Sequence, residues 1–189
     1  AGLDVLLGLE DRPGPRWPDL VGAGELPGEQ VLDVLPRWGP CAVLSSDRHR
    51  PGATDPAAVE DLVATLAPAC GTLVLDLDRG DVLAGRAPVR WCDLVVVVAG
   101  RDLASVGGAL ALRAALGAVA GRTGLAVRAV PGGLSVTEVA QAVGLPLLCR
   151  VPHERGLGAA AERGALPVRG RAARAAGQVA VTVLDGRAA

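Results

Sequence analysis

Two apolar runs limit what this chain can fold into more than any other feature. The first run covers residues 72–76 and the second covers residues 93–98. Neither run alternates apolar with polar residues, a pattern that is typical of strands buried on both faces of a parallel sheet. Such a sheet needs a covering layer on each face. The two runs therefore predict an α/β fold in which helices cover a mostly parallel sheet.

The composition indicates a core of small aliphatic side chains. Half of the 189 residues are hydrophobic but only 2% are aromatic, with three Trp and neither Tyr nor Phe. A core of Val, Leu and Ala suits packed layers of helix and sheet. A chain of this length can bury a sizeable core within one domain. We therefore expect residues 1–189 to form a single domain.

Charge and cysteine usage exclude several classes of protein. The formal net charge is −1 and there is no basic stripe, so direct binding to nucleic acid is not expected. No apolar run approaches the roughly 20 residues that span a bilayer, and no signal peptide is visible, which indicates a cytoplasmic protein. The four cysteines form no C-x-x-C pair, so we interpret them as small hydrophobic residues of a reducing compartment. They are Cys41, Cys70, Cys92 and Cys149.

Helical and strand patterns alternate along the chain. The patterns predict helices at residues 3–9, 25–35, 56–66, 103–119 and 136–143. They predict strands at residues 41–45, 72–77, 93–99, 125–130 and 147–151. From residue 172 the Ala-rich spacing favours a helix, although the β-branched residues 179–183 leave a strand open. The alternation predicts a doubly wound, mostly parallel sheet.

Three segments resemble the MinD/ParA family of deviant-Walker ATPases. The opening Leu-Asp-Val-Leu-Leu-Gly-Leu-Glu at residues 3–10 resembles the segment after that family's first switch region. Residues 72–80 resemble its Walker B strand and second switch, where Asp76 and Gly80 match an Asp-x-x-x-Gly pattern. Residues 151–154 resemble a late strand and loop that line the adenine pocket. The resemblance extends over nearly the whole chain and implies a P-loop NTPase-like fold.

Shorter motifs resemble one branch of that family. Residues 16–19 (Arg-Trp-Pro-Asp), the Leu-Pro-Leu-Leu at residues 145–148 and residues 152–157 are similar to the actinobacterial CpaE-like, or septum site-determining (Ssd), proteins. This resemblance implies a cytoplasmic regulator that positions the division septum or a Tad-type pilus and secretion machinery. It also implies protein partners from that machinery and leaves a homodimer open.

The resemblance also assigns roles to six residues. Asp76 would hold Mg²⁺ through a water molecule, and the alternative is that it caps the loop that follows it. Asp4, next to the first switch, could face the nucleotide or a dimer partner, or be a solvated acid at a helix end. The remaining implied residues are Gly80 and Asp78 of the second switch and Pro152 and Glu154 of the base pocket.

The departures from the family pattern concern phosphate binding. The motif G-x-x-x-x-G-K-[ST] requires a lysine, and this chain has none. The phosphate loop and first switch would precede Ala1, so we expect a fold that is incomplete at its N-terminus. We accordingly expect ATP and Mg²⁺ to bind in a complete protein and weakly or not at all here, with no hydrolysis of ATP.

Two hypotheses follow from this pattern. One is a regulator that switches with bound nucleotide, and the other is a pseudo-ATPase scaffold that binds no nucleotide. The tail at residues 169–184, basic at Arg169, Arg171 and Arg174 and then apolar at Val179–Leu184, resembles the amphipathic membrane helix of MinD. Because that tail is short and is interrupted by Gly177, we expect no membrane contact.

Overall fold

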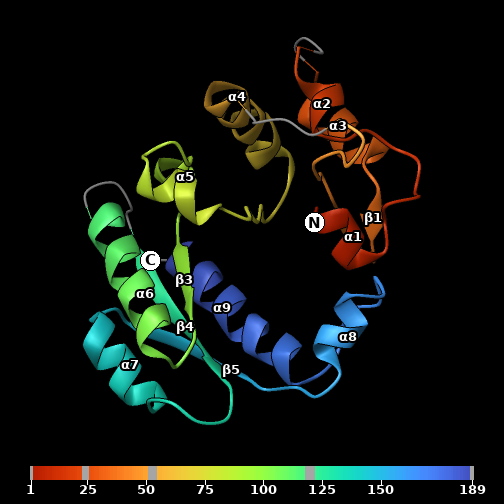
Figure 1. The fold of residues 1–189 in the computed structure, drawn as a ribbon. Coiled ribbons are helices and arrows are strands. Elements are labelled where there is room, and N and C mark those ends of the chain that lie inside the picture. The colour runs from red at the N-terminus through yellow and green to blue at the C-terminus, as the bar shows by residue number, and fades with distance from the viewer. Residues whose placement is uncertain (1, 23–25, 51–54, 118–121, 188–189) are drawn as a thin grey trace. The chain divides into compact units, whose positions relative to one another are not determined.

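The structure, a computed structural model, describes residues 2–22, 26–50, 55–117 and 122–187 (Figure 1). The internal contacts divide the chain into two compact units. Unit 1 comprises Ala1–Asp76 with Gly156–Pro167, and unit 2 comprises Leu77–Arg155 with Val168–Ala189. The single domain expected from the sequence stays a prediction.

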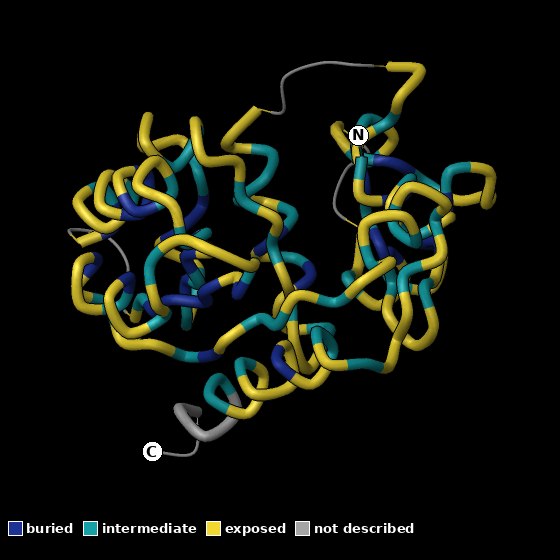
Figure 2. Tube along the Cα trace, turned by 60° about the horizontal axis from the view of Figure 1, so that its bottom comes forward, coloured by how far each residue is buried: buried dark blue, intermediate teal, exposed yellow. Residues whose placement is uncertain are grey.

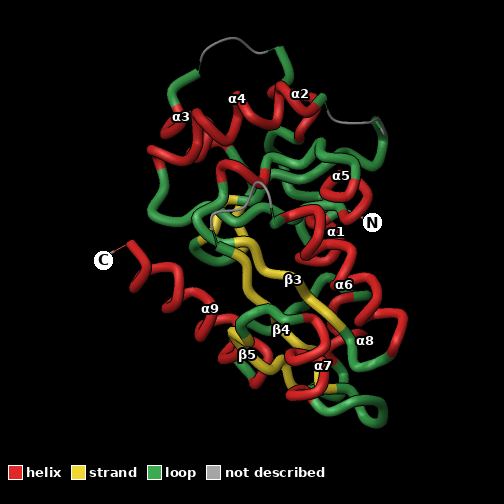
Figure 3. The backbone as a smooth tube through the Cα atoms, turned by 90° about the vertical axis from the view of Figure 1, so that its left-hand side faces the viewer, coloured by secondary structure: helices red, strands yellow, loops and turns green. Residues whose placement is uncertain are grey.

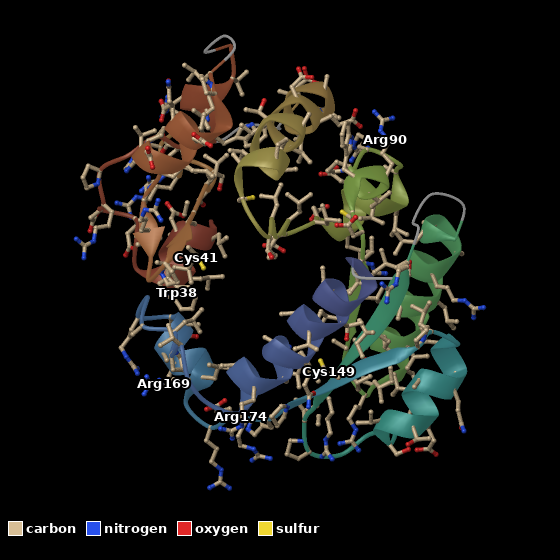
Figure 4. The ribbon with its side chains drawn as sticks, turned by 180° about the vertical axis from the view of Figure 1, so that it is seen from behind. Trp38, Cys41, Arg90, Cys149, Arg169 and Arg174 are labelled. Atoms are coloured by element: carbon tan, nitrogen blue, oxygen red, sulfur yellow. The ribbon has the colours of Figure 1, made fainter. Side chains whose placement is uncertain are left out.

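Unit 1 is mainly helical. Its strands β1 (Arg37–Trp38) and β2 (Cys41–Ala42) form a short antiparallel hairpin, on which Trp38 and Cys41 are paired (Figure 4). Its core is formed by buried residues of α3 and α4 and of the turn after α3, namely Val31, Leu35 and Leu66. The helices are α1 (Leu3–Leu7), α2 (Trp17–Leu20), α3 (Gly28–Val34), α4 (Pro56–Leu66), the 3-10 helix η1 (Ala67–Ala69) and α8 (Leu157–Ala161).

Two strand predictions in unit 1 need correction. The strand predicted at residues 41–45 is confirmed only for Cys41–Ala42, and it pairs antiparallel with β1 instead of joining a parallel sheet. The strand predicted at residues 72–77 is wrong, because residues 72–78 belong to no strand and Val74 is 85% exposed. An apolar run indicates that burial would be favourable, but it does not supply the neighbouring strand that a ladder needs.

Unit 2 contains a parallel sheet (Figure 3). The strands β3 (Val95–Ala99), β4 (Thr123–Ala129) and β5 (Leu147–Pro152) lie in the order β3-β4-β5, and both pairs are parallel. The helices of this unit are α5 (Arg79–Leu83), the 3-10 helix η2 (Val89–Trp91), α6 (Leu103–Leu116), α7 (Val136–Val143) and α9 (Arg171–Arg187).

Helices cover both faces of the sheet. Figure 1 shows α6 and α7 on one side of the strands and α9 on the other. The strands alternate accordingly, since Val97 and Val127 belong to the cluster with α6 and α7, whereas Ala126 and Cys149 pack with Ala175 of α9 (Figure 4). Buried residues follow the strands and the inner faces of these helices (Figure 2). The predicted α/β fold with a doubly wound parallel sheet is confirmed.

The helix predictions mostly hold. The bounds of α4 and α7 agree with the predicted ranges, and the chain after residue 170 is the helix α9 rather than a strand. The strand alternative fails because Ala175 is buried against β4 and β5, where a helix closes the second face of the sheet. Residue 25, predicted as helix, and residues 118–119 at the predicted end of α6 lie outside the described residues. No described helix combines the length and the apolar character that crossing a membrane requires.

Candidate functional site

The carboxyl edge of the sheet in unit 2 is the candidate site. Open parallel sheets bind their ligands at the carboxyl ends of the strands, where the connecting loops meet. Here the loops follow Ala99, Ala129 and Pro152, the last residues of β3, β4 and β5. We use the name carboxyl edge for residues 100–102, 130–135 and 152–155.

Arg101 ties the first two loops of the carboxyl edge together. Its Nη1 donates a hydrogen bond of 2.7 Å to the carbonyl oxygen of Val130, and its Nε donates to the carbonyl oxygen of Leu134. The backbone N–H of Leu134 donates in return to the carbonyl oxygen of Arg101 at 2.8 Å. Gly133 allows this approach, because a Cβ at that position would collide with the Arg101 carbonyl oxygen. The guanidinium is therefore engaged by backbone carbonyl oxygens of the loop after β4.

Two helices at the carboxyl edge begin with capping side chains. Asp102 accepts hydrogen bonds from the N–H and Oγ of Ser105 at 2.8 and 2.6 Å, and so caps α6. Ser135 and Glu138 form a capping box at the start of α7. These hydrogen bonds lower the pKa of Asp102, chiefly through the Ser105 hydroxyl, and the pKa of Glu138, chiefly through the Ser135 backbone. Both carboxylates thus serve the fold.

Glu154, predicted for the base pocket, caps a helix. Its Oε2 accepts a hydrogen bond of 3.0 Å from the backbone N–H of Ala172 in the first turn of α9. Gly170 lies immediately before that helix with φ of 142° and lets the chain pass close to the carboxylate. Pro152 ends β5 and pairs with Ala129 of β4. The structure thus brings Pro152 and Glu154 into one loop, where Glu154 has a structural partner.

The residues assigned to the second switch lie together at the start of α5. Asp78 caps α5, since its Oδ1 accepts a hydrogen bond of 3.1 Å from the N–H of Asp81. Gly80 lies within α5. Asp76 is exposed and belongs to unit 1, and it follows no strand. The buried strand that was predicted to end at Asp76 is absent, so no strand positions this carboxylate.

Asp4 lies in a closed network inside unit 1. It is 4% exposed, and its Oδ1 accepts a hydrogen bond of 3.0 Å from the hydroxyl of Ser45. Its Oδ2 lies 3.4 Å from Nε of Arg16. Nη2 of Arg16 donates to the carbonyl oxygens of Leu9 and Arg12 at 2.8 and 3.1 Å. The interpretation of Asp4 as a solvated acid is wrong, and its carboxylate is occupied by internal partners.

The described residues do not by themselves fit a Mg²⁺-nucleotide site. Magnesium in nucleotide sites takes one or two carboxylates together with phosphate oxygens. Of the candidate carboxylates, Asp78 and Glu154 already accept backbone hydrogen bonds, and no strand positions Asp76. Within the described ranges, no three His, Cys, Asp or Glu side chains gather as metal ligands would.

The sequence prediction missed the bracing residue of the carboxyl edge. Arg101 comes two residues after β3, immediately before the N-cap Asp102, and that position was the available signal. From that position Arg101 reaches the loop after β4, where it donates to the carbonyl oxygens of Val130 and Leu134. Arg16 was part of a recognised motif, but its role as partner of Asp4 was not predicted.

Comparison with solved structures identifies the architecture. The chain aligns with a MinC:MinD cell division protein complex of Aquifex aeolicus with a TM-score of 0.73 and 19% identity, over 97% of this chain and 78% of that one. The chain has the MinD/ParA fold. MinD of Aquifex aeolicus gives a TM-score of 0.67 at 17% identity (97% and 80% covered), and a ParA family ATPase of Chlorobium tepidum gives 0.68 at 17% (97% and 78%).

The sequence relatives of this chain are longer proteins. The chain is 36% identical over 172 residues to the uncharacterized proteins MT3760 and Rv3660c of Mycobacterium tuberculosis, strains CDC 1551 / Oshkosh and H37Rv. The alignment covers 90% of this chain and 49% of each relative, so the chain spans about half of their length. No protein-family model matches the chain.

Proposed function

We propose that this chain belongs to a MinD-like regulator that acts by binding other proteins and does not turn over ATP by itself. The observation that carries the proposal is that charged side chains at the carboxyl edge form structural hydrogen bonds. Arg101 braces two loops, and Asp102 and Glu154 cap helices, so the charged groups where a ligand is expected hold the fold together. The MinD/ParA fold is kept, while its carboxyl edge stabilises loops and helices.

Hydrolysis of ATP requires catalytic groups that we do not find in this chain. Phosphoryl transfer needs the charge of the phosphates neutralised and a water molecule positioned for attack. The sequence contains no lysine, and its candidate metal carboxylate Asp76 is exposed and outside any strand. We therefore expect this chain to hydrolyse no ATP above background.

The setting that we propose is cell organisation in the cytoplasm. The motifs at residues 16–19 and 152–157 support the CpaE-like or Ssd branch and hence a role at the division septum or a Tad-type pilus and secretion machinery. One structure with this fold is a complex of MinD with MinC, which supports a protein rather than a metabolite as partner. A homodimer is compatible with this role.

A second candidate function is a nucleotide switch in a longer protein. The relatives are about twice as long as the aligned region, which leaves room for a phosphate-binding segment outside residues 1–189. In the described part of the chain β3 pairs only with β4, so its outer edge can accept a further strand. In that case Asp76, Gly80, Pro152 and Glu154 would adjust around the nucleotide once the segment is present.

Calorimetry with Mg²⁺-ATP separates the two functions. It is run on this chain and on a natural protein of the relatives' full length, each with and without Asp76→Ala. We expect no binding by this chain. Binding by the longer protein that Asp76→Ala weakens supports the switch, and no binding by either at millimolar ATP supports the scaffold. ATP turnover by this chain that is lost in Asp76→Ala contradicts the proposal.

A further inference from the structure

The solvent-facing side of α6 is apolar along the whole helix. Its inner side packs into the core with the sheet and α7 through Val106, Ala109 and Leu116. Of the exposed residues of α6, only Arg113 is polar or charged. A surface helix of a soluble protein usually turns charged and polar residues outward. The other exposed residues, which we call the α6 face, are Leu103, Ala104, Gly107, Leu110, Ala111 and Ala114.

Leu103 and Leu110 make the α6 face unfavourable to leave in water. Their exposed fractions are 80% and 41%. Because they are seven residues apart, they lie on the same side of the helix, about two turns from each other. Gly107 lies between them, where an added Cβ would meet no atom of a neighbouring element within 4 Å. Exposed apolar surface that is contiguous in this way marks sites of association on soluble proteins.

We propose that the α6 face binds the same face of a second copy of this chain, with the two helices antiparallel. The twofold axis passes between Gly107 and Leu110, so Leu110 lies opposite Gly107 of the second copy. By the same symmetry Leu103 lies opposite Ala114 of the second copy. Each leucine therefore meets a small residue, which lets the helix axes approach to roughly 8 Å. A face that fits itself in this way closes into a twofold dimer.

The charges at the two ends of α6 favour the antiparallel direction. Asp102 bonds to Ser105, and Nη1 of Arg113 donates a hydrogen bond of 2.8 Å to the carbonyl oxygen of Val143. These partners are neutral, and within the described part of the chain neither Asp102 nor Arg113 forms an ion pair. In the antiparallel dimer Asp102 of each copy comes within about 3 Å, along the helix axis, of Arg113 of the other. A parallel dimer would instead place like charges together.

The α6 face is less suited to the other common partners of an apolar surface. A basic or an acidic helix would find no charge on the face itself. A helix that lies on a membrane carries several Lys or Arg residues beside its apolar side, and α6 has Arg113 alone. The proposed association needs no nucleotide and goes beyond the proposed function.

Sedimentation equilibrium of the full chain, without nucleotide, tests the proposal. The chain is run from the micromolar to the submillimolar range. We expect a reversible monomer–dimer equilibrium. Because one pair of 14-residue helices gives a small interface, the dissociation constant should be roughly 10–100 µM.

A charge placed in the middle of the α6 face should disrupt the dimer. Leu110→Arg puts a guanidinium against Gly107 of the second copy, and we expect the dimer to weaken at least about tenfold. Leu147→Arg makes the same change in β5, at a leucine that is 44% exposed and lies outside the α6 face. This control should change the dissociation constant less than about twofold.

Gly107→Gln separates loss of the dimer from loss of the fold. The new side chain has open space in the monomer but would occupy the position of Leu110 of the second copy. Gly177→Gln makes the same change in α9, also at a glycine with open space around it. Both substitutions introduce a better helix former, so neither should unfold the chain. We expect Gly107→Gln to weaken the dimer about tenfold and Gly177→Gln to leave it unchanged.

Reversal of Arg113 tests the charge argument. Arg113→Glu places a second carboxylate beside Asp102 of the other copy, which should weaken the dimer about three- to fivefold. Arg150→Glu, at an exposed position of β5, is the matched control and should have an effect below about twofold. Circular dichroism checks that each variant is folded.

Three results overturn the proposal. One is a chain that stays monomeric at the highest concentration, which leaves the α6 face to a different protein. Another is equal weakening by Leu110→Arg and Leu147→Arg, which moves the interface away from α6. The third is a dimer that Gly107→Gln does not weaken. Because no arm contains nucleotide, none of these results bears on the proposed absence of ATP turnover.

Discussion

The carboxylate of Glu154 and the backbone N–H of Ala172, 18 residues apart, are joined by a hydrogen bond of 3.0 Å. The bond links the loop after β5 to the first turn of α9, the helix that covers one face of the sheet through Ala175. A residue that the family resemblance assigns to a base pocket therefore fixes the start of a helix. A role in capping α9 predicts that loss of the Glu154 carboxylate lowers stability, whereas a role in a base pocket predicts an effect on nucleotide binding.

Glu154→Ala is expected to lower the free energy of unfolding by about 1 kcal/mol, because the first turn of α9 loses a capping acceptor. Urea denaturation followed by circular dichroism measures the change. Glu162→Ala, which removes an exposed carboxylate from the C-cap of α8, is the control and should have little effect. Unchanged stability in Glu154→Ala would contradict the capping role.

Arg101→Ala is expected to destabilise unit 2 by about 2 kcal/mol, since the carbonyl oxygens of Val130 and Leu134 lose a charged donor. Arg101→Lys should recover only part of this loss, because an ammonium group lacks the planar fork that reaches both carbonyls. Chemical denaturation of both variants tests the order. Arg150→Ala, at an exposed position of β5, provides the control. Equal stability of Arg101→Lys and the parent chain would argue against a bracing role.

Stability should fall in acid partly through Asp102 and Glu138. The pKa of each is lower in the folded chain than in the unfolded one, so their contribution is present above the unfolded pKa and is lost as pH falls through the folded pKa. Asp102→Asn keeps a capping acceptor but cannot titrate. We expect it to be less stable than the parent chain at neutral pH, to approach the parent as pH falls between about pH 5 and pH 2, and so to show a shallower decline of stability. Parallel declines in both proteins would show that Asp102 does not contribute.

The sequence predicted those parts of the fold whose signals are local. The N-cap Ser135 and the apolar spacing after it define α7, and Asp55 with Pro56 defines the start of α4. The Val-rich run at residues 95–99 forms β3, because β4 lies beside it and helices cover both its faces. In these elements local pattern and packing agree.

The same reasoning failed at residues 72–77, where the run is apolar but no strand forms. Strand formation depends on a neighbour far along the sequence, and composition does not reveal whether that neighbour is present. The roles of Glu154 and Asp78 were missed for a related reason. A carboxylate beside a strand end can bind a metal or cap a helix, and only the position of the helix decides between them.

Gly8→Ala is expected to destabilise unit 1 by about 2 kcal/mol or more. Gly8 has φ of 68°, and a Cβ there would collide with the carbonyl oxygen of Gly164. Gly39→Ala is the matched control, because Gly39 has φ of 57° but open space around it, so its loss should be limited to about 1 kcal/mol of backbone strain. The difference in urea midpoint between the variants isolates the collision, and equal midpoints would exclude it.

Arg16→Met is expected to lower the stability of unit 1 more than Gly8→Ala does. The Arg16 and Asp4 side chains are 10% and 6% exposed, and removing the cation leaves a buried carboxylate with Ser45 as its remaining side-chain partner. A broken pair of this kind costs about 3–5 kcal/mol. Asp4→Asn in the same chain should restore part of the loss, because the amide needs no counter-charge. Thermal unfolding of the single and double variants measures the coupling. Strictly additive effects would show that Arg16 acts through its carbonyl contacts alone, and a positive coupling would show that the pair itself organises the start of the chain.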